Sequence, residues 1–184
     1  IGYVEYIDMV KLSKLLTNDP RHVYLVAQPG RFIHPSMPVL YLSQGQESSI
    51  NTDLLETIIV SDARSFAQDP RFCLSVMAEI ACRALSPAVN DPGTAIDVIG
   101  RGVRILSTYA QNKSDEIEVK YPSVHVAPLQ NNDLLEDFFS PVARDGASMR
   151  EIQIRVLKGL SMLSKGWPEI FAEAAHTLAF ETLE

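Results

Sequence analysis

Hydrophobic residues are spaced in two different ways along this chain. Over the first 60 residues they alternate with polar residues in short runs, such as GYVEYI at residues 2–7, a pattern that is typical of β-strands. From residue 69 onward they mostly recur every three or four positions, which is typical of amphipathic helices. The pattern therefore predicts an α+β protein, with a small β-rich module at residues 1–60 and a mainly helical module at residues 61–184.

Short strands and turns make up the β-rich module. We expect strands at residues 2–7, 22–27, 39–42 and 57–60, with short helices after Asp8 and near residues 52–56. Pro29-Gly30 suits the two central positions of a type II turn. The run from Pro29 to Leu42 resembles half of the barrel-sandwich motif of biotinyl and lipoyl domains. No lysine stands at a hairpin tip of this run, so we expect a barrel-sandwich-like shape without an attached cofactor.

Two long helices joined by a proline-rich elbow, Ser86 to Pro92, form the centre of the helical module. Asp69-Pro70 and Asp91-Pro92 each predict a helix start, because aspartate caps free N–H groups and proline fits the first helical position. Ser86-Pro87 ends the first helix, since a residue before proline avoids the α region. The expected buried stripes are Phe72, Cys73, Val76, Met77, Ile80, Ala81 and Ala84 in the first helix, and Ala95, Ile96, Ile99, Val103, Leu106 and Ala110 in the second.

An inserted hairpin and three more helices complete the helical module. Alternating apolar residues predict the hairpin at 117–126, and helical spacing predicts helices that start near residues 131, 148 and 168. We expect Pro141 to kink or divide the first of these helices, because proline removes a backbone hydrogen bond. Ser148 and Glu151 match a capping box, which predicts the start of the next one.

The composition and charge narrow the range of partners. The 184 residues carry a net charge of −7 and contain no dense basic run, which argues against a nucleic-acid surface because phosphate binding needs clustered Lys and Arg. No run of about 18 apolar residues occurs, so we expect no segment to span a bilayer. The sequence starts without methionine, which suggests a fragment of a longer protein.

The two cysteines of the chain, Cys73 and Cys82, lie nine residues apart in the first long helix. That spacing is about 13 Å along a helix axis, which excludes a disulfide between them within one straight helix. We interpret both as small hydrophobic residues in a protein from a reducing compartment.

The elbow carries a family resemblance. The run ALSPAVNDPGTA, from Ala84 to Ala95, resembles the ALSP-x-x-NDP-x-TA signature of the DUF2254 family, predicted bacterial membrane proteins of unknown function. Shorter matches lie at Gly2-Tyr3-Val4, at residues 29–33 and at residues 68–72. The resemblance implies the soluble extramembrane region of a bacterial inner-membrane protein, with the membrane helices preceding this sequence. The acidic composition with two cysteines predicts that this region lies in the cytoplasm.

Six residues at or near the elbow form the candidate ligand site. They are Arg83, Ser86, Asn90, Asp91, Thr94 and Arg101. In one interpretation they make only the turn and cap hydrogen bonds of the elbow. In another, the free N–H groups and dipole at the start of the second helix bind an anion, although Asp91 competes for those groups and the fold must bring Arg83 and Arg101 to the elbow. A protein contact is the third alternative.

The sequence shows no catalytic constellation. Its four histidines share no metal-ligand spacing: they are His22, His34, His125 and His176. Ser86 does not lie in a G-x-S-x-G nucleophile motif. We therefore assign no catalytic residue, no metal and no cofactor.

Three functions remain as hypotheses. The first is a non-enzymatic assembly or sensing platform that forms homo-oligomers through the apolar stripes of the helical module. The second is a regulatory domain that binds a small anion or a nucleotide at the elbow. The third is a hydrolase that uses Ser86 or the carboxylates of Asp133, Glu136 and Asp137.

Overall fold

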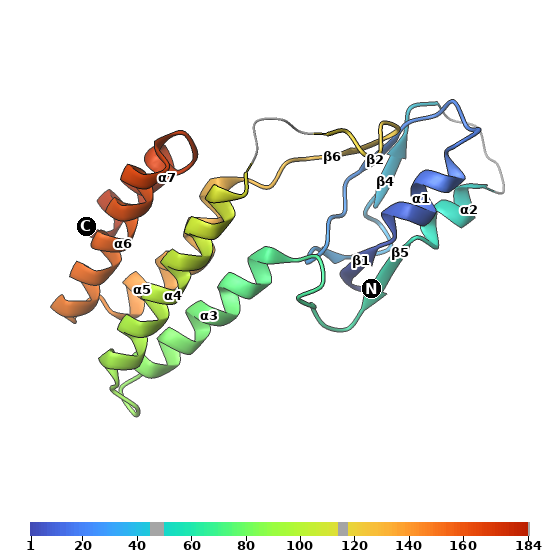
Figure 1. The fold of residues 1–184 in the computed structure, drawn as a ribbon. Coiled ribbons are helices and arrows are strands. Elements are labelled where there is room, and N and C mark those ends of the chain that lie inside the picture. Colours follow the sequence, from blue (N-terminus) through green and yellow to red (C-terminus); the bar gives the residue numbers. More distant parts are fainter. Residues whose placement is uncertain (45–49, 114–117, 184) are drawn as a thin grey trace. The chain divides into compact units, whose positions relative to one another are not determined.

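The chain divides into two compact units, which we describe separately. The computed structural model describes residues 1–44, 50–113 and 118–183. The first unit, called the β unit here, comprises Ile1–Phe72 and Ile117–Pro128. The second, called the helical unit, comprises Cys73–Glu116 and Leu129–Glu184. Strands in the one and long helices in the other confirm the α+β class (Figure 1).

Two three-stranded sheets and two short helices build the β unit. Its elements are β1 (Gly2–Ile7), α1 (Met9–Leu15), β2 (Val23–Leu25), β3 (Phe32–Ile33), β4 (Leu40–Leu42), α2 (Ile50–Leu55), β5 (Ile58–Ser61) and β6 (Val124–Val126). One sheet has the order β3-β1-β5 and is antiparallel, and the other has the order β4-β2-β6. As the sequence predicts, Asp8 caps α1 by accepting a hydrogen bond from the Lys11 N–H, and the turn before β3 holds Gly30 at a φ of 88°.

Strand β6 and its pairing differ from the hairpin that the sequence predicts. Among residues 118–126 only β6 is a strand, and it pairs in parallel with β2, so that Val23 lies opposite Val124. Ile117, the start of the predicted hairpin, lies outside the described residues. Alternation of apolar and polar residues indicates a strand but does not name its partner, and here the partner lies about a hundred residues earlier in the chain.

Five helices form the helical unit. They are α3 (Pro70–Leu85), which enters the unit at Cys73, α4 (Pro92–Gln111), α5 (Asn131–Asp145), α6 (Arg150–Gly166) and α7 (Pro168–Leu183). Pro70, Pro92 and Pro168 each open a helix, as predicted. The core is built around three fully buried phenylalanines, Phe138, Phe139 and Phe171.

The buried face of α3 differs from the predicted stripe. It consists of Leu74, Ala78, Ala81, Ala84 and Leu85. Ile80, which the sequence placed inside, is 49% exposed, and Met77 is only partly buried. Ala81 and Ala84 belong to both stripes, as predicted, and the other members differ by a rotation of the helix that still satisfies helical spacing. Alanines face the core because they allow close approach, which leaves the larger side chains at the edge of the interface.

Two further expectations about the helices need correction. Pro141 does not divide helix α5, because a proline removes only one N–H from the helix and the helix continues on both sides of it. Helix α6 starts at Arg150 with Met149 as its N-cap, and no side chain caps it. A Ser148–Glu151 capping box requires serine at the N-cap position, one residue earlier, so the box does not form.

Gly102 of α4 faces the ring of Phe138, and this contact generates a first prediction. A methyl group added at Gly102 would lie only 2.1 Å from the ring atom Cζ. We expect Gly102→Ala to lower the free energy of unfolding by about 2 kcal/mol, because the buried ring has no room to move. Gly166→Ala is the matched control, since no atom lies within 4 Å of its added methyl group. Urea unfolding of both variants measures this, and equal stabilities would contradict the packing.

Candidate functional site

The elbow between α3 and α4 is closed by hydrogen bonds among its own residues. The hydroxyl of Ser86 donates to the carbonyl oxygen of Arg83 at 2.7 Å. The backbone N–H of Asn90 donates to the carbonyl of Ser86, and that of Asp91 to the carbonyl of Ala84, each at 2.8 Å. Asn90 adopts a left-handed conformation with a φ of 48°. The chain therefore reverses direction with its polar groups satisfied locally.

Asp91 occupies the start of α4. One oxygen of its carboxylate accepts from the N–H of Thr94 at 3.0 Å, and the other accepts from the Thr94 hydroxyl at 2.6 Å. The hydroxyl, followed by the backbone N–H, lowers the pKa of Asp91 below its usual value. These bonds use a donor that an anion would need, so the geometry favours a structural role for Asp91 and Thr94.

The structure separates the six candidate residues. Four of them, Ser86, Asn90, Asp91 and Thr94, belong to the hydrogen-bonded elbow. Arg83 lies on the exposed side of α3. Arg101 lies two turns into α4, pairs with Asp97 at 2.7 Å, and lines cavities on either side of it. Among the six, Arg101 is a charged residue that lines the described cavities.

The first of these cavities, between α4 and α6, is called the arginine pocket here. It has a volume of about 390 Å³ and is lined by Gly93, Ile96, Asp97, Gly100, Arg101, Arg104 and Arg155. Three guanidinium groups thus face one carboxylate. Within the described part of the chain, Asp97 pairs with Arg101, whereas Arg104 and Arg155 have no ion-pair partner.

Gly100 allows Arg155 of α6 to lie close to the backbone of α4 in the arginine pocket. A methyl group at Gly100 would lie 3.3 Å from Nη2 of Arg155, so the guanidinium rests close to the bare backbone of α4. The sequence contained part of this signal, because Gly100, Arg101 and Arg104 share one side of a predicted helix. Sequence reasoning missed Arg155 because α6 is far along the chain and only packing brings it to α4.

The second cavity, between α3 and α4, is called the apolar groove here. It has a volume of about 420 Å³ and is lined by Met77, Ile80, Val98, Arg101, Arg104 and Ile105. Ile80 and Ile105 are 49% and 45% exposed, and Val98 is buried. Arg101 and Arg104 line both cavities, so a cationic site and an apolar site share one wall.

A family assignment follows from the comparison with known families. The model of the family described as "Predicted membrane protein (DUF2254)" matches residues 1–162. This chain belongs to the DUF2254 family. The match confirms the resemblance carried by the elbow run, which lies within it.

Short matches link this DUF2254 chain to mycobacterial proteins. It is 51% identical over 45 residues to an uncharacterized protein of Mycobacterium bovis and to two of Mycobacterium tuberculosis. The match covers 24% of this chain and 9% of each relative, so the chain spans a small part of their length. No solved structure matches the chain. Among the described residues, no helix has the length and hydropathy needed to cross a membrane.

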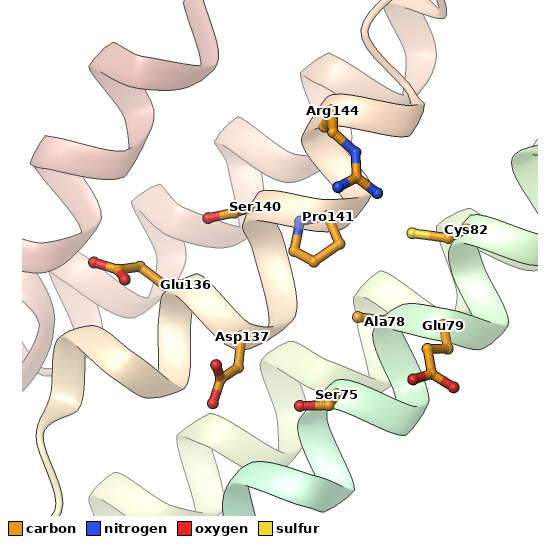
Figure 2. Close-up of a pocket in the computed structure, with 9 residues that line it drawn as sticks. All are labelled: Ser75, Ala78, Glu79, Cys82, Glu136, Asp137, Ser140, Pro141 and Arg144. Atoms are coloured by element: carbon orange, nitrogen blue, oxygen red, sulfur yellow. The ribbon is translucent and has the colours of Figure 1, made fainter.

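A third cavity of the DUF2254 chain lies between α3 and α5. It measures about 630 Å³, and Figure 2 shows Cys82 and Arg144 near one end and Ser75 and Asp137 near the other. Burial, with a hydrogen bond to the Asp145 carboxylate, raises the pKa of the Cys82 thiol to about 12. A thiol with so high a pKa is a poor nucleophile at neutral pH, because only the thiolate attacks.

The version of the hydrolase hypothesis that uses Ser86 requires a base beside this residue, and the geometry gives none among the described residues. The Ser86 hydroxyl donates to the carbonyl of its own helix. Two histidines do meet, in the β unit: Nδ1 of His22 lies 2.8 Å from Nε2 of His125, and the His125 ring stacks on Tyr24. Sequence reasoning missed this pair because β2 and β6 are distant in the chain and adjacent in the sheet.

The left-handed conformation at Asn90 generates a second prediction. Asn90→Ala should lower the free energy of unfolding by about 1 kcal/mol, because alanine lacks the short polar side chain that lets asparagine adopt a φ of 48°, while Asn90→Gly should cost little because glycine adopts this conformation freely. Asn112→Ala is the matched control, since Asn112 has an ordinary φ of −91°. Urea unfolding compares them, and an equal loss in the Ala and Gly variants would show that the side chain matters instead.

The raised pKa of Cys82 generates a third prediction. In a Cys73→Ser background, iodoacetamide at pH 8 should alkylate native Cys82 at least about 100-fold more slowly than the urea-unfolded chain, because a higher pKa leaves less thiolate at that pH. Mass spectrometry of timed samples measures the rate. Similar rates in the native and unfolded chains would contradict the burial of this thiol.

Proposed function

We propose that this chain is a sensing region of a DUF2254 membrane protein, and that its helical unit binds an anion in the arginine pocket. The single observation behind the proposal is the meeting of Arg101, Arg104 and Arg155 around one cavity. The second hypothesis from the sequence, a small-ligand regulatory domain, is therefore kept, with its site moved from the elbow to the α4/α6 interface.

The charge balance of the pocket supports an anionic ligand. The whole chain carries a net charge of −7, yet here three arginines face one aspartate. Asp97 offsets Arg101, so Arg104 and Arg155 are available to a ligand. Guanidinium groups donate in a planar fork that matches phosphate and carboxylate oxygens, which makes these two the chemical classes we expect.

The shape of the pocket supports the same conclusion. Gly93 and Gly100 present no side chains on the α4 wall, so a ligand can approach the helix closely between the arginines. The arginines come from two helices whose packing is fixed by the core, which holds two sides of the site at a set distance. The helix backbones of the site are therefore in place before a ligand binds, and binding has to order only the exposed arginine side chains.

The setting of the site in the whole protein is part of the proposal. The full-length protein lies in the bacterial inner membrane through helices outside this sequence, and this region lies on the cytoplasmic side. The free thiols of Cys73 and Cys82 support a reducing compartment. Self-association through the helical unit stays a prediction, as does the absence of nucleic-acid binding.

The fourth prediction tests the anion site. Inorganic phosphate, pyrophosphate and ATP are titrated by calorimetry and in thermal unfolding, where a ligand of the native state raises the midpoint temperature. Arg155→Gln should weaken binding of the best anion about tenfold or more, because a charge-assisted hydrogen bond is lost. Arg150→Gln is the matched control: Arg150 is exposed on the same helix and does not line the pocket.

Two outcomes would contradict this site. One is that none of the three anions shifts the unfolding temperature or releases heat. The other is an equal loss of affinity in Arg155→Gln and Arg150→Gln, which would indicate general attraction between anions and positive charge instead of a built pocket.

A further inference from the structure

The apolar groove beside the arginine pocket indicates the class of ligand. We propose that the anion is the headgroup of a single-chain amphiphile, such as an alkyl phosphate or a fatty acid, whose alkyl chain lies in the groove between α3 and α4. This inference rests on the proposed anion site and specifies what that site binds.

The shared wall of the two cavities is the first step. Arg101 and Arg104 line both the arginine pocket and the apolar groove. They are three positions apart on α4, so both lie along one edge of the helix. On one side of that edge Arg155 of α6 completes the cationic site, and on the other side α3 completes the groove. A headgroup held by the arginines therefore has an apolar surface within reach.

The chemistry of the groove is the second step. Apart from the two arginines, its lining consists of Met77, Ile80, Val98 and Ile105. Ile80 and Ile105 leave 49% and 45% of their surface in contact with water, and Val98 is 7% exposed. An alkyl chain in the groove would remove this apolar surface from water, which a phosphate ion alone cannot do.

The charge and the shape of the site together favour one kind of ligand. Arg104 and Arg155, which have no ion-pair partner among the described residues, suit a headgroup with one or two negative charges. One groove of about 420 Å³ with a mainly apolar lining suits a single alkyl chain. An acidic amphipathic helix or a bilayer surface would also combine acid with apolar area, so the experiment includes arms that identify them.

The fifth prediction is a dependence of affinity on chain length. Calorimetry compares inorganic phosphate with butyl, hexyl, octyl and decyl phosphate, each below its micelle concentration. Affinity should rise about threefold to fourfold for each added methylene until the groove is filled, because each one leaves water. Arg155→Gln should weaken every member of the series, phosphate included.

Variants in the groove separate the contribution of the alkyl chain to the affinity from that of the headgroup. Ile80→Ser should reduce the gain per methylene while leaving the affinity for inorganic phosphate unchanged. Ile59→Ser is the matched control, because Ile59 has the same 49% exposure and lies on β5 of the other unit. It should leave both quantities unchanged.

The possible failures are distinguishable. Phosphate binding that is lost in Arg155→Gln but shows no chain-length dependence would overturn this inference and keep the anion site. Absence of binding by phosphate and by all alkyl phosphates would overturn both. Equal gains per methylene in the parent, Ile80→Ser and Ile59→Ser chains would also overturn it, because they indicate adsorption outside the groove.

Two further experiments test the alternatives of a bilayer surface and a protein partner. Flotation with phosphatidylglycerol vesicles that depends on Ile80, without binding of free alkyl phosphates, would overturn the inference in favour of a bilayer surface. Binding of an acidic amphipathic peptide that depends on Ile80, again without binding of alkyl phosphates, would overturn it in favour of a protein partner. Binding of free alkyl phosphates with the predicted dependence supports it.

Discussion

The close approach of α4 to α5 at Gly102 is the constraint on which the helical unit depends. The ring of Phe138 fills the space where any side chain at this position would lie. This contact fixes which side of α4 faces the core, and Arg101 and Arg104 consequently face outward. The same rotation brings Gly100 beneath Arg155 of α6. The packing of the core therefore positions the arginines of the cationic site. No hydrogen bond or ion pair between helices is required to hold them there.

The buried alanines of α3 have a second consequence. Between Leu74 and Leu85, the core face of this helix consists of Ala78, Ala81 and Ala84, which reach only a short way toward the neighbouring helices. Met77 and Ile80 border the apolar groove on one side, while Ser75 and Cys82 border the α3/α5 cavity on the other. Leucines in place of these three alanines would extend further toward the neighbours. Small residues thus place α3 and leave cavities on both of its flanks.

The sequence predicted features that depend on residues close together in the chain. It did not predict contacts between segments that are far apart in the chain. Asp8 and Asp91 cap helices as predicted, because a cap bond joins residues three positions apart. The rotation of α3 was misjudged because two sets of residues fit the helical period and only the neighbours decide between them. Arg101 was found on its helix, whereas Arg155 was not, since the contact between α4 and α6 leaves no local pattern. The partner of β6 was missed for the same reason.

The elbow and the candidate site are therefore not competing explanations for the residues between Ser86 and Arg101. The hydrogen bonds that Thr94 donates to Asp91, with the left-handed Asn90, shape the turn by which the chain passes from α3 to α4 and so affect the angle between the two helices. That angle determines the width of the apolar groove, because α3 and α4 are its two walls. It does not determine the arginine pocket, whose walls are α4 and α6. A structural elbow is thus compatible with a ligand site, and the part of the site it governs is the apolar one.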